Sequence, residues 1–139
     1  MLLLTMQTEY ALLALGYLAR VVDRRLVSAR EIAAHYNIPP ELLAKLLQRC
    51  SRDGLVRSTP GPNGGYALTC SLHEVTVADV LRVVEGRLPL VRCAGENCCQ
   101  VANACDISEP MRHIHARLVD VLERVPLSEI FAETAEIRT

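Results

Sequence analysis

Apolar residues recur along most of this chain at three- and four-residue intervals, the spacing that gives an α-helix one apolar face. In the first such segment, at about residues 7–22, that face consists of Tyr10, Leu13, Ala14, Tyr17, Leu18 and Val21. Ser28 and Glu31 form a Ser-x-x-Glu capping box, which predicts a short helix over about residues 29–36. Asn37 suits the left-handed position that ends such a helix.

A third helix and a hairpin follow. The two prolines at 39–40 open the helix, because proline is tolerated in a first turn, and Gly54 closes it. Its apolar face consists of Leu42, Leu43, Leu46 and Leu47. Short strand-like runs at residues 55–58 and 66–69 enclose a segment, 59–65, that is rich in Gly, Pro and Asn. These residue types favour tight turns, so we expect a β-hairpin with its tip there.

The second half of the chain predicts two more helices, separated by an irregular stretch. The first begins at Thr76 and ends at Gly86. Residues 88–107 have no helical period and contain four of the six cysteines. A Ser-Glu-Pro start at 108–110 opens the last long helix, which Pro126 ends. The fold class we expect is therefore mainly α with a small β-hairpin.

Two short helices joined by a tight turn and followed by a hairpin describe a winged helix-turn-helix. In that arrangement the second helix enters the major groove, and the hairpin reaches the backbone or the minor groove. Lys45 and Gln48 are candidates to read base edges, and the arginines of this segment are candidates to neutralise phosphates. The candidate DNA contacts are Glu41, Lys45, Gln48, Arg49, Arg52, Arg57, Asn63 and Gly64. The same pattern also fits a helical domain whose third helix has a solvated polar face.

The charge distribution supports a negatively charged partner for the front half only. Residues 1–60 contain eight Lys and Arg against five Asp and Glu, a balance of +3, whereas residues 61–139 contain seven against eleven, a balance of −4. Aromatic residues are scarce, with four Tyr, one Phe and no Trp. This scarcity argues against a base-stacking surface for single-stranded nucleic acid.

No segment is long and apolar enough to cross a membrane, since about twenty such residues are needed. The apolar start at residues 1–6 has neither the positive flank nor the cleavage site of a signal peptide. We therefore expect a cytoplasmic protein with no membrane partner. In that compartment cysteines serve as ligands or redox thiols more often than as structural disulfides.

Four cysteines, Cys93, Cys98, Cys99 and Cys105, lie within thirteen residues. In the set Cys93, Cys99 and Cys105 each gap is five residues. There is no Cys-x-x-Cys pair, which disfavours a zinc ribbon or a thioredoxin-type site. Three thiolates suit an iron–sulfur cluster, zinc or copper(I). They also suit a switch in which the thiols form disulfides and bind no metal.

Three thiolates leave a metal centre one ligand short. The candidates for the fourth ligand are Glu9, His35, His113, His115 and Asp106. Adjacent Cys98 and Cys99 point apart in an extended chain, so we expect only one of them to be a ligand. Cys50 and Cys70 stand alone in a helix and at a strand end, and we interpret them as small buried residues.

Several of these segments together resemble the iron–sulfur cluster-binding winged-helix transcription regulator family of IscR and NsrR. The resemblance spans nearly the whole chain and rests on residues 9–12, 32–46, 54–56, the wing sequence Gly61-Pro-Asn-Gly-Gly-Tyr66, and Cys93-x5-Cys99-x5-Cys105. Pro60 stands where wings of the family often have an arginine, which weakens the case for minor-groove reading there. Ser108 stands where one branch has a histidine ligand.

The resemblance implies a homodimer formed through a long dimerisation helix, Pro110 to Val125. It also implies a cluster, 2Fe–2S in preference to 4Fe–4S, held by Cys93, Cys99 and Cys105. The fourth ligand would be Glu9, supplied by the other subunit.

The expected organisation has three parts. Residues 1–86 form the winged helix-turn-helix DNA-binding domain, 87–107 a cysteine-rich cluster-binding loop, and 108–139 the dimerisation helix and C-terminal tail. We expect a transcriptional regulator, acting as a repressor on double-stranded operator DNA. Its cluster would sense iron or cluster status, redox state or nitric oxide. The alternatives are a cluster-free thiol or zinc switch on the same fold, and an electron or cluster carrier.

An enzyme is not expected. The sequence contains no nucleophile elbow, P-loop, dinucleotide fingerprint or pair of catalytic carboxylates.

Overall fold

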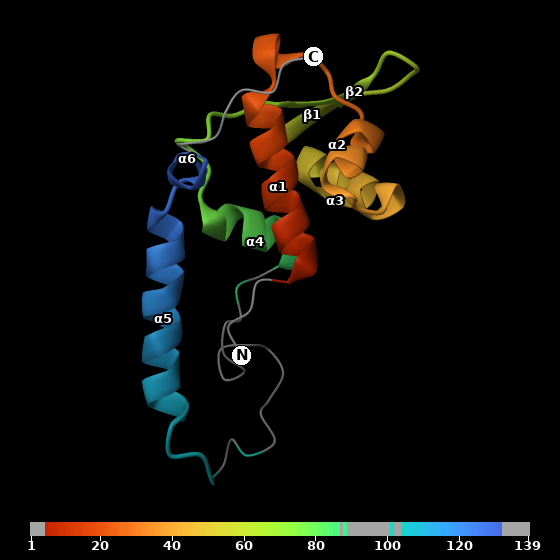
Figure 1. Cartoon of the computed structure of the whole chain (residues 1–139). Coiled ribbons are helices and arrows are strands. Elements are labelled where there is room, and N and C mark those ends of the chain that lie inside the picture. Colours follow the sequence, from red (N-terminus) through yellow and green to blue (C-terminus); the bar gives the residue numbers. More distant parts are fainter. Residues whose placement is uncertain (1–4, 87, 89–100, 102–103, 132–139) are drawn as a thin grey trace.

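A computed structural model describes residues 5–86, 88, 101 and 104–131 of the chain. Its elements are α1 (Met6–Arg20), the 3-10 turn η1 (Val22–Arg24), α2 (Ala29–Tyr36), α3 (Pro40–Arg52), β1 (Val56–Thr59), β2 (Gly65–Leu68), α4 (Val77–Glu85), α5 (Ser108–Arg124) and α6 (Leu127–Ile130). The expected mainly α fold with one hairpin is confirmed. In Figure 1 the α2–α3 pair and the tip of the hairpin lie on one side of α1, and α5 lies on the other.

Local capping signals set the bounds of the short helices. The Ser28 hydroxyl accepts a hydrogen bond of 3.1 Å from the N–H of Glu31 and so starts α2. Asn37 takes the left-handed conformation that ends α2, with φ 55°. In α4 both halves of a capping box are present, between Thr76 and Asp79.

Three local predictions were wrong. The Glu31 side chain does not complete the capping box at Ser28, because it turns to Arg25 and Tyr17 instead. The first helix ends at Arg20 rather than near residue 22, because Val21 takes an extended conformation and the left-handed Asp23 and Arg24 follow it. Leu13 does not face the core: it is 37% exposed, while Ala11 and Leu15 are buried.

The core lies where α1, α3 and α4 meet. Leu15 of α1, Leu43, Leu46 and Leu47 of α3 and Val80 of α4 are among its most buried members. Leu42, predicted to share the apolar face of α3, is only half-buried. The opposite face of α3 is thereby left to solvent.

The hairpin is pinned to the connection between α1 and α2. Its strands pair antiparallel from Val56 opposite Leu68 to Thr59 opposite Gly65, one residue away from the predicted bounds. Val27 exchanges two backbone hydrogen bonds with Tyr66, of 2.9 and 2.7 Å. A Cβ atom on Gly65 would lie 2.7 Å from the Val27 backbone, so a glycine is needed for this approach.

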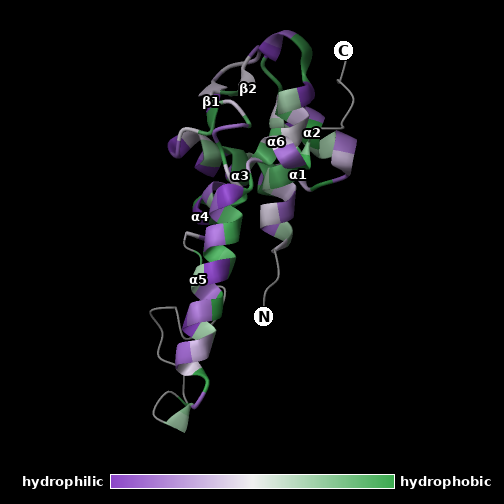
Figure 2. Cartoon of the chain, turned by 90° about the vertical axis from the view of Figure 1, so that its left-hand side faces the viewer, coloured by the Kyte–Doolittle hydropathy of each residue, from purple (hydrophilic) through white to green (hydrophobic). Residues whose placement is uncertain are grey.

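The segment after α5 packs back on the N-terminal half. Leu127 is fully buried, and its N–H donates to the Val75 carbonyl over 2.8 Å. The Phe131 ring lies where a Cβ atom on Gly16 of α1 would be, at 2.5 Å. The C-terminal end of α5 is therefore held against the predicted DNA-binding domain, while its N-terminal end extends away from it (Figure 2). No helix among the described residues is long and apolar enough to span a membrane.

Candidate functional site

The exposed face of α3 gathers most of the predicted DNA contacts. Glu41, Lys45, Gln48 and Arg52 are all exposed and follow one another at helical spacing along a single face. Pro39 and Pro40 begin the helix, and its buried leucines occupy the face opposite to this row. The arrangement leaves a row of long polar side chains that no other element in the described part of the chain covers.

The wing and α3 border a common hollow. A cavity of about 530 Å³ separates Gln48 from the hairpin tip. It is lined by Ser28, Ala29, Gln48, Ser58, Thr59, Pro60, Gly61, Pro62, Gly64, Gly65 and Tyr66. Asn63, at the hairpin tip, and Arg57, on β1, are both exposed and lie close in sequence to the residues that line this cavity. A duplex that contacts Gln48 from this side would therefore also meet the wing.

The start of α2 also borders this hollow, which the sequence interpretation missed. Ser28 and Ala29 line it together with Gln48 and Gly64. The Ser28 cap was visible in the sequence, but its distance from Gln48 along the chain gave no sign that the two would meet.

Gly64 is required at the wing for a steric reason. A Cβ atom there would lie 1.9 Å from the carbonyl oxygen of Thr59, inside the hairpin. Any larger residue forces the turn to open. Gly64 thus shapes the wing, beyond allowing the backbone to approach a ligand.

Arg49 stands apart from the other predicted contacts. Its Nη1 donates a hydrogen bond of 3.0 Å to the carbonyl of Val84, in the last turn of α4. Its guanidinium therefore faces the neighbouring helix of the fold, although the residue as a whole is exposed.

A polar network holds α2 against α1. The buried Tyr17 hydroxyl donates to Glu31 Oε2 over 2.9 Å, and Arg25 donates to both carboxylate oxygens over 3.2 and 3.0 Å. The hydrogen bonds from Arg25 are the main cause that lowers the pKa of Glu31, against the opposing effect of burial. Burial, and then the Glu31 carboxylate, raise the pKa of Tyr17, so this hydroxyl stays a donor.

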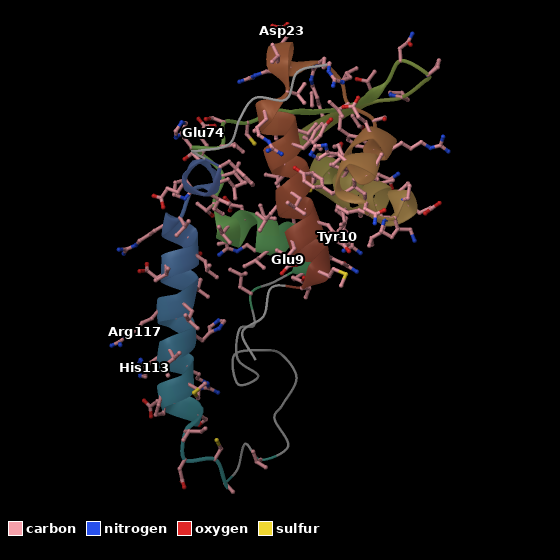
Figure 3. All side chains as sticks on the ribbon, viewed as in Figure 1. Glu9, Tyr10, Asp23, Glu74, His113 and Arg117 are labelled. Carbon is pink, nitrogen blue, oxygen red and sulfur yellow. The ribbon has the colours of Figure 1, made fainter. Side chains whose placement is uncertain are left out.

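Of the predicted cluster ligands, Cys93 and Cys99 lie outside the described residues, as does Cys98. Cys105 is a half-buried free thiol that precedes α5, and Glu9 is exposed in the first turn of α1 (Figure 3). Within the described ranges, no three His, Cys, Asp or Glu side chains come close enough to hold a metal ion. A thiolate is the donor that iron–sulfur clusters take, and an exposed carboxylate is an oxygen donor open to a metal centre, so the chemistry of Cys105 and Glu9 is compatible with the predicted ligand set.

The other candidates for a fourth ligand have different surroundings. His35 packs edge-on against Tyr17 and Tyr36, with ring centroids 5.2 and 4.6 Å away. His113 points outward from α5 (Figure 3). The Nδ1 atom of His115 is buried without a hydrogen-bond partner among the described residues. Asp106 is exposed directly after Cys105.

The two remaining cysteines are packing residues. Cys50 is 1% exposed, and burial, with a smaller contribution from Asp53, raises the pKa of its thiol to about 11. Cys70 is half-buried, and burial is also the main cause that raises its pKa. The prediction of a small buried residue is confirmed for Cys50 and holds partly for Cys70. Neither thiol is prepared to act as a thiolate.

Known proteins match this chain over nearly all its length. The Rrf2 family, described as iron-dependent transcriptional regulators, matches residues 4–133. YffB of Lactococcus lactis, provisionally named an HTH-type transcriptional regulator, is 33% identical over 134 residues, which cover 92% of this chain and 84% of the relative.

Solved structures of regulators share the fold. CymR (YrzC), the global cysteine regulator of B. subtilis, superposes with a TM-score of 0.76 at 24% identity, covering 96% of this chain and 99% of CymR. IscR of T. potens superposes with a TM-score of 0.70 at 23% identity, covering 98% and 94%. The relatives are named as transcriptional regulators and not as enzymes, in agreement with the sequence analysis. With the winged helix-turn-helix in place, this chain belongs to the Rrf2 family of winged-helix transcriptional regulators.

Proposed function

We propose that this protein is a repressor that binds double-stranded operator DNA as a homodimer in the cytoplasm. The observation that carries the proposal is the common hollow between the polar face of α3 and the wing. Both DNA-reading parts of a winged helix-turn-helix thereby face the same side of the fold. The free thiols of Cys50, Cys70 and Cys105 are compatible with a reducing compartment.

The predicted contacts other than Arg49 each have a role in this binding. Lys45 and Gln48 read base edges in the major groove, with Glu41 at the start of the same face. Arg52 and Arg57 neutralise phosphates. At the wing, Asn63 and Gly64 form the turn that approaches the duplex.

The homodimer is supported by an apolar stripe along α5. Ile107, Ile114 and Val121 are 61%, 45% and 55% exposed, and they follow one another at intervals of seven residues. The half-buried Met111 and Leu118 lie between them, so the spacing alternates between four and three residues. This is the repeat with which two helices pack together. None of the 17 residues of α5 is buried within the protomer, and a second copy of the helix would cover the stripe.

The iron–sulfur cluster is the finer part of the proposal. Cys93, Cys99 and Cys105 of one protomer would hold it together with Glu9 of the other, with 2Fe–2S favoured. A bound cluster supplies a centre that responds to iron supply, oxidants or nitric oxide. It can change DNA affinity only by stabilising one arrangement of the dimer over another. Support comes from the accessibility of Cys105 and Glu9 and from the spacing of the three cysteines.

Two measurements test the proposal. Iron and acid-labile sulfide in near-equal amounts, in anaerobically purified protein, would support the cluster. Substitution Glu9→Ala would then change the spectrum or the stability of the cluster, with Glu41→Ala as the matched exposed carboxylate. Protein that contains no iron after reconstitution would refute the cluster and leave a thiol or zinc switch.

DNA binding is tested separately. A duplex selected from a random-sequence pool should bind with an affinity that falls steeply with salt and should contain two half-sites about one helical turn apart. A flat salt response would refute DNA binding, whatever the iron content.

A further inference from the structure

The C-terminal turn of α4 is a junction for three other helices. Val84 accepts the hydrogen bond from Arg49 of α3 over 3.0 Å. Glu85 accepts one of 2.9 Å from the hydroxyl of Thr8, a fully buried residue of α1, and another from Thr5. One turn earlier, Arg82 forms an ion pair with Glu123 of α5. A single short helix is thus bonded to α1, α3 and α5.

The bond from Arg49 has a clear physical cause. The last four carbonyl groups of a helix have no partner within it, and together they form the negative end of the helix dipole. The Val84 carbonyl is one of these, because α4 ends at Glu85. A guanidinium placed there satisfies the carbonyl and complements the dipole. Arg49 therefore acts as a cap on α4 from outside that helix.

The position of Arg49 on α3 agrees with this role. The row formed by Lys45, Gln48 and Arg52 faces solvent. Arg49 lies at one edge of this row, about 40° around the helix from Lys45 and about 100° from Gln48. From this edge its side chain reaches α4. The neighbouring arginines Arg52 and Arg57 have no such bond among the described residues, and they remain the phosphate contacts.

We propose that Arg49 is a positioning residue, which sets the recognition helix α3 against α4 rather than neutralising a DNA phosphate. Because α4 is also bonded to α5 and α1, it passes a movement of the dimerisation helix to α3 through this contact. The inference rests on the proposed DNA-binding function and deepens it.

The salt dependence of DNA binding separates the two roles. Each phosphate contact contributes about 0.9 to the slope of log affinity against log salt concentration, so removing one from both subunits of a dimer lowers the slope by about 1.8. Arg49→Met removes the donor and keeps the apolar stem that packs on the fold. Arg52→Ala and Arg57→Ala are the matched controls, and the probe is a duplex selected from a random-sequence pool by the wild-type protein.

We expect Arg49→Met to weaken binding at every salt concentration by about tenfold for each subunit, because each subunit loses one charge-assisted hydrogen bond, with the wild-type slope unchanged. The two controls should lower the slope. A slope reduced by about 1.8 in Arg49→Met would overturn the inference, and so would unchanged affinity. A wild-type protein without a steep slope would refute the proposed function itself, which is a different result.

A measurement on the wild-type protein covers the case in which Arg49→Met fails to fold. The guanidinium N–H resonance of Arg49 should be protected from exchange in the free protein and should not shift when the duplex is added. A shift as large as those of Arg52 and Arg57 would overturn the positioning role.

Discussion

Substitution Leu127→Ala tests whether the C-terminal segment is part of the DNA-binding domain. Leu127 is fully buried in the core that α1 and α4 share, although it follows α5 in the chain. The substitution removes three buried carbon atoms, which costs about 2.4 kcal/mol at about 0.8 kcal/mol each. The cavity left behind brings the expected loss of unfolding free energy to about 3–4 kcal/mol.

The assay is urea denaturation of the wild-type protein and the variants at one fixed protomer concentration, because the proposed dimer would add to the apparent stability. Ile130→Ala is the matched control: it lies in the same short helix, is 45% exposed, and should cost less than about 1 kcal/mol. The backbone hydrogen bond from residue 127 to Val75 remains in the variant, so the difference reports the side chain alone. If Leu127→Ala were no more destabilising than Ile130→Ala, the packing of α6 on the core would be wrong.

Three other outcomes are expected. Gly64→Ala should weaken DNA binding and leave the helical circular dichroism unchanged. The alanine Cβ atom would lie 1.9 Å from the Thr59 oxygen, so the wing must open while the helices stay in place. Unchanged affinity for DNA would contradict a role for the wing. Glu31→Gln should destabilise the protein at neutral pH, and progressively less as the pH falls below 4.5, the ordinary pKa of this carboxyl. Arg25 lowers the pKa of Glu31 in the folded state, so the ionised carboxylate stabilises the fold and this stabilisation is lost when Glu31 is protonated. Equal effects at pH 7 and pH 3 in thermal melts would contradict this prediction. Lys45→Ala should abolish the preference for a selected duplex over random DNA without changing iron content, and a retained preference would exclude base reading by this residue.

Local signals predicted much of the fold. The bounds of α2 follow from Ser28 and Asn37, each of which acts on atoms within a few residues of itself. Proline at the start of α3 and the glycine-rich turn of the hairpin act over the same short range. The family resemblance was confirmed because it rests on motifs of this kind.

The sequence also determined which residues could be ligands, through the five-residue gaps between Cys93, Cys99 and Cys105. The proposed meeting of these side chains with Glu9 is a matter of tertiary and quaternary structure, and Cys93 and Cys99 lie outside the described residues. The spacing therefore defines the donor set on which the proposed cluster rests.

Only the tertiary structure decided which partner each polar side chain takes. Glu31 forms hydrogen bonds with Arg25 and Tyr17 rather than with the cap of its own helix. Arg49 donates to a carbonyl 35 residues away rather than pointing into solvent with Lys45 and Gln48. Likewise Leu127 enters a core built mainly from the first half of the chain. Helix caps and turns are decided by neighbours along the chain, because their bonds close within one turn of backbone. The orientation of a long side chain is decided by whichever unpaired group or apolar surface the packing of distant elements brings near it.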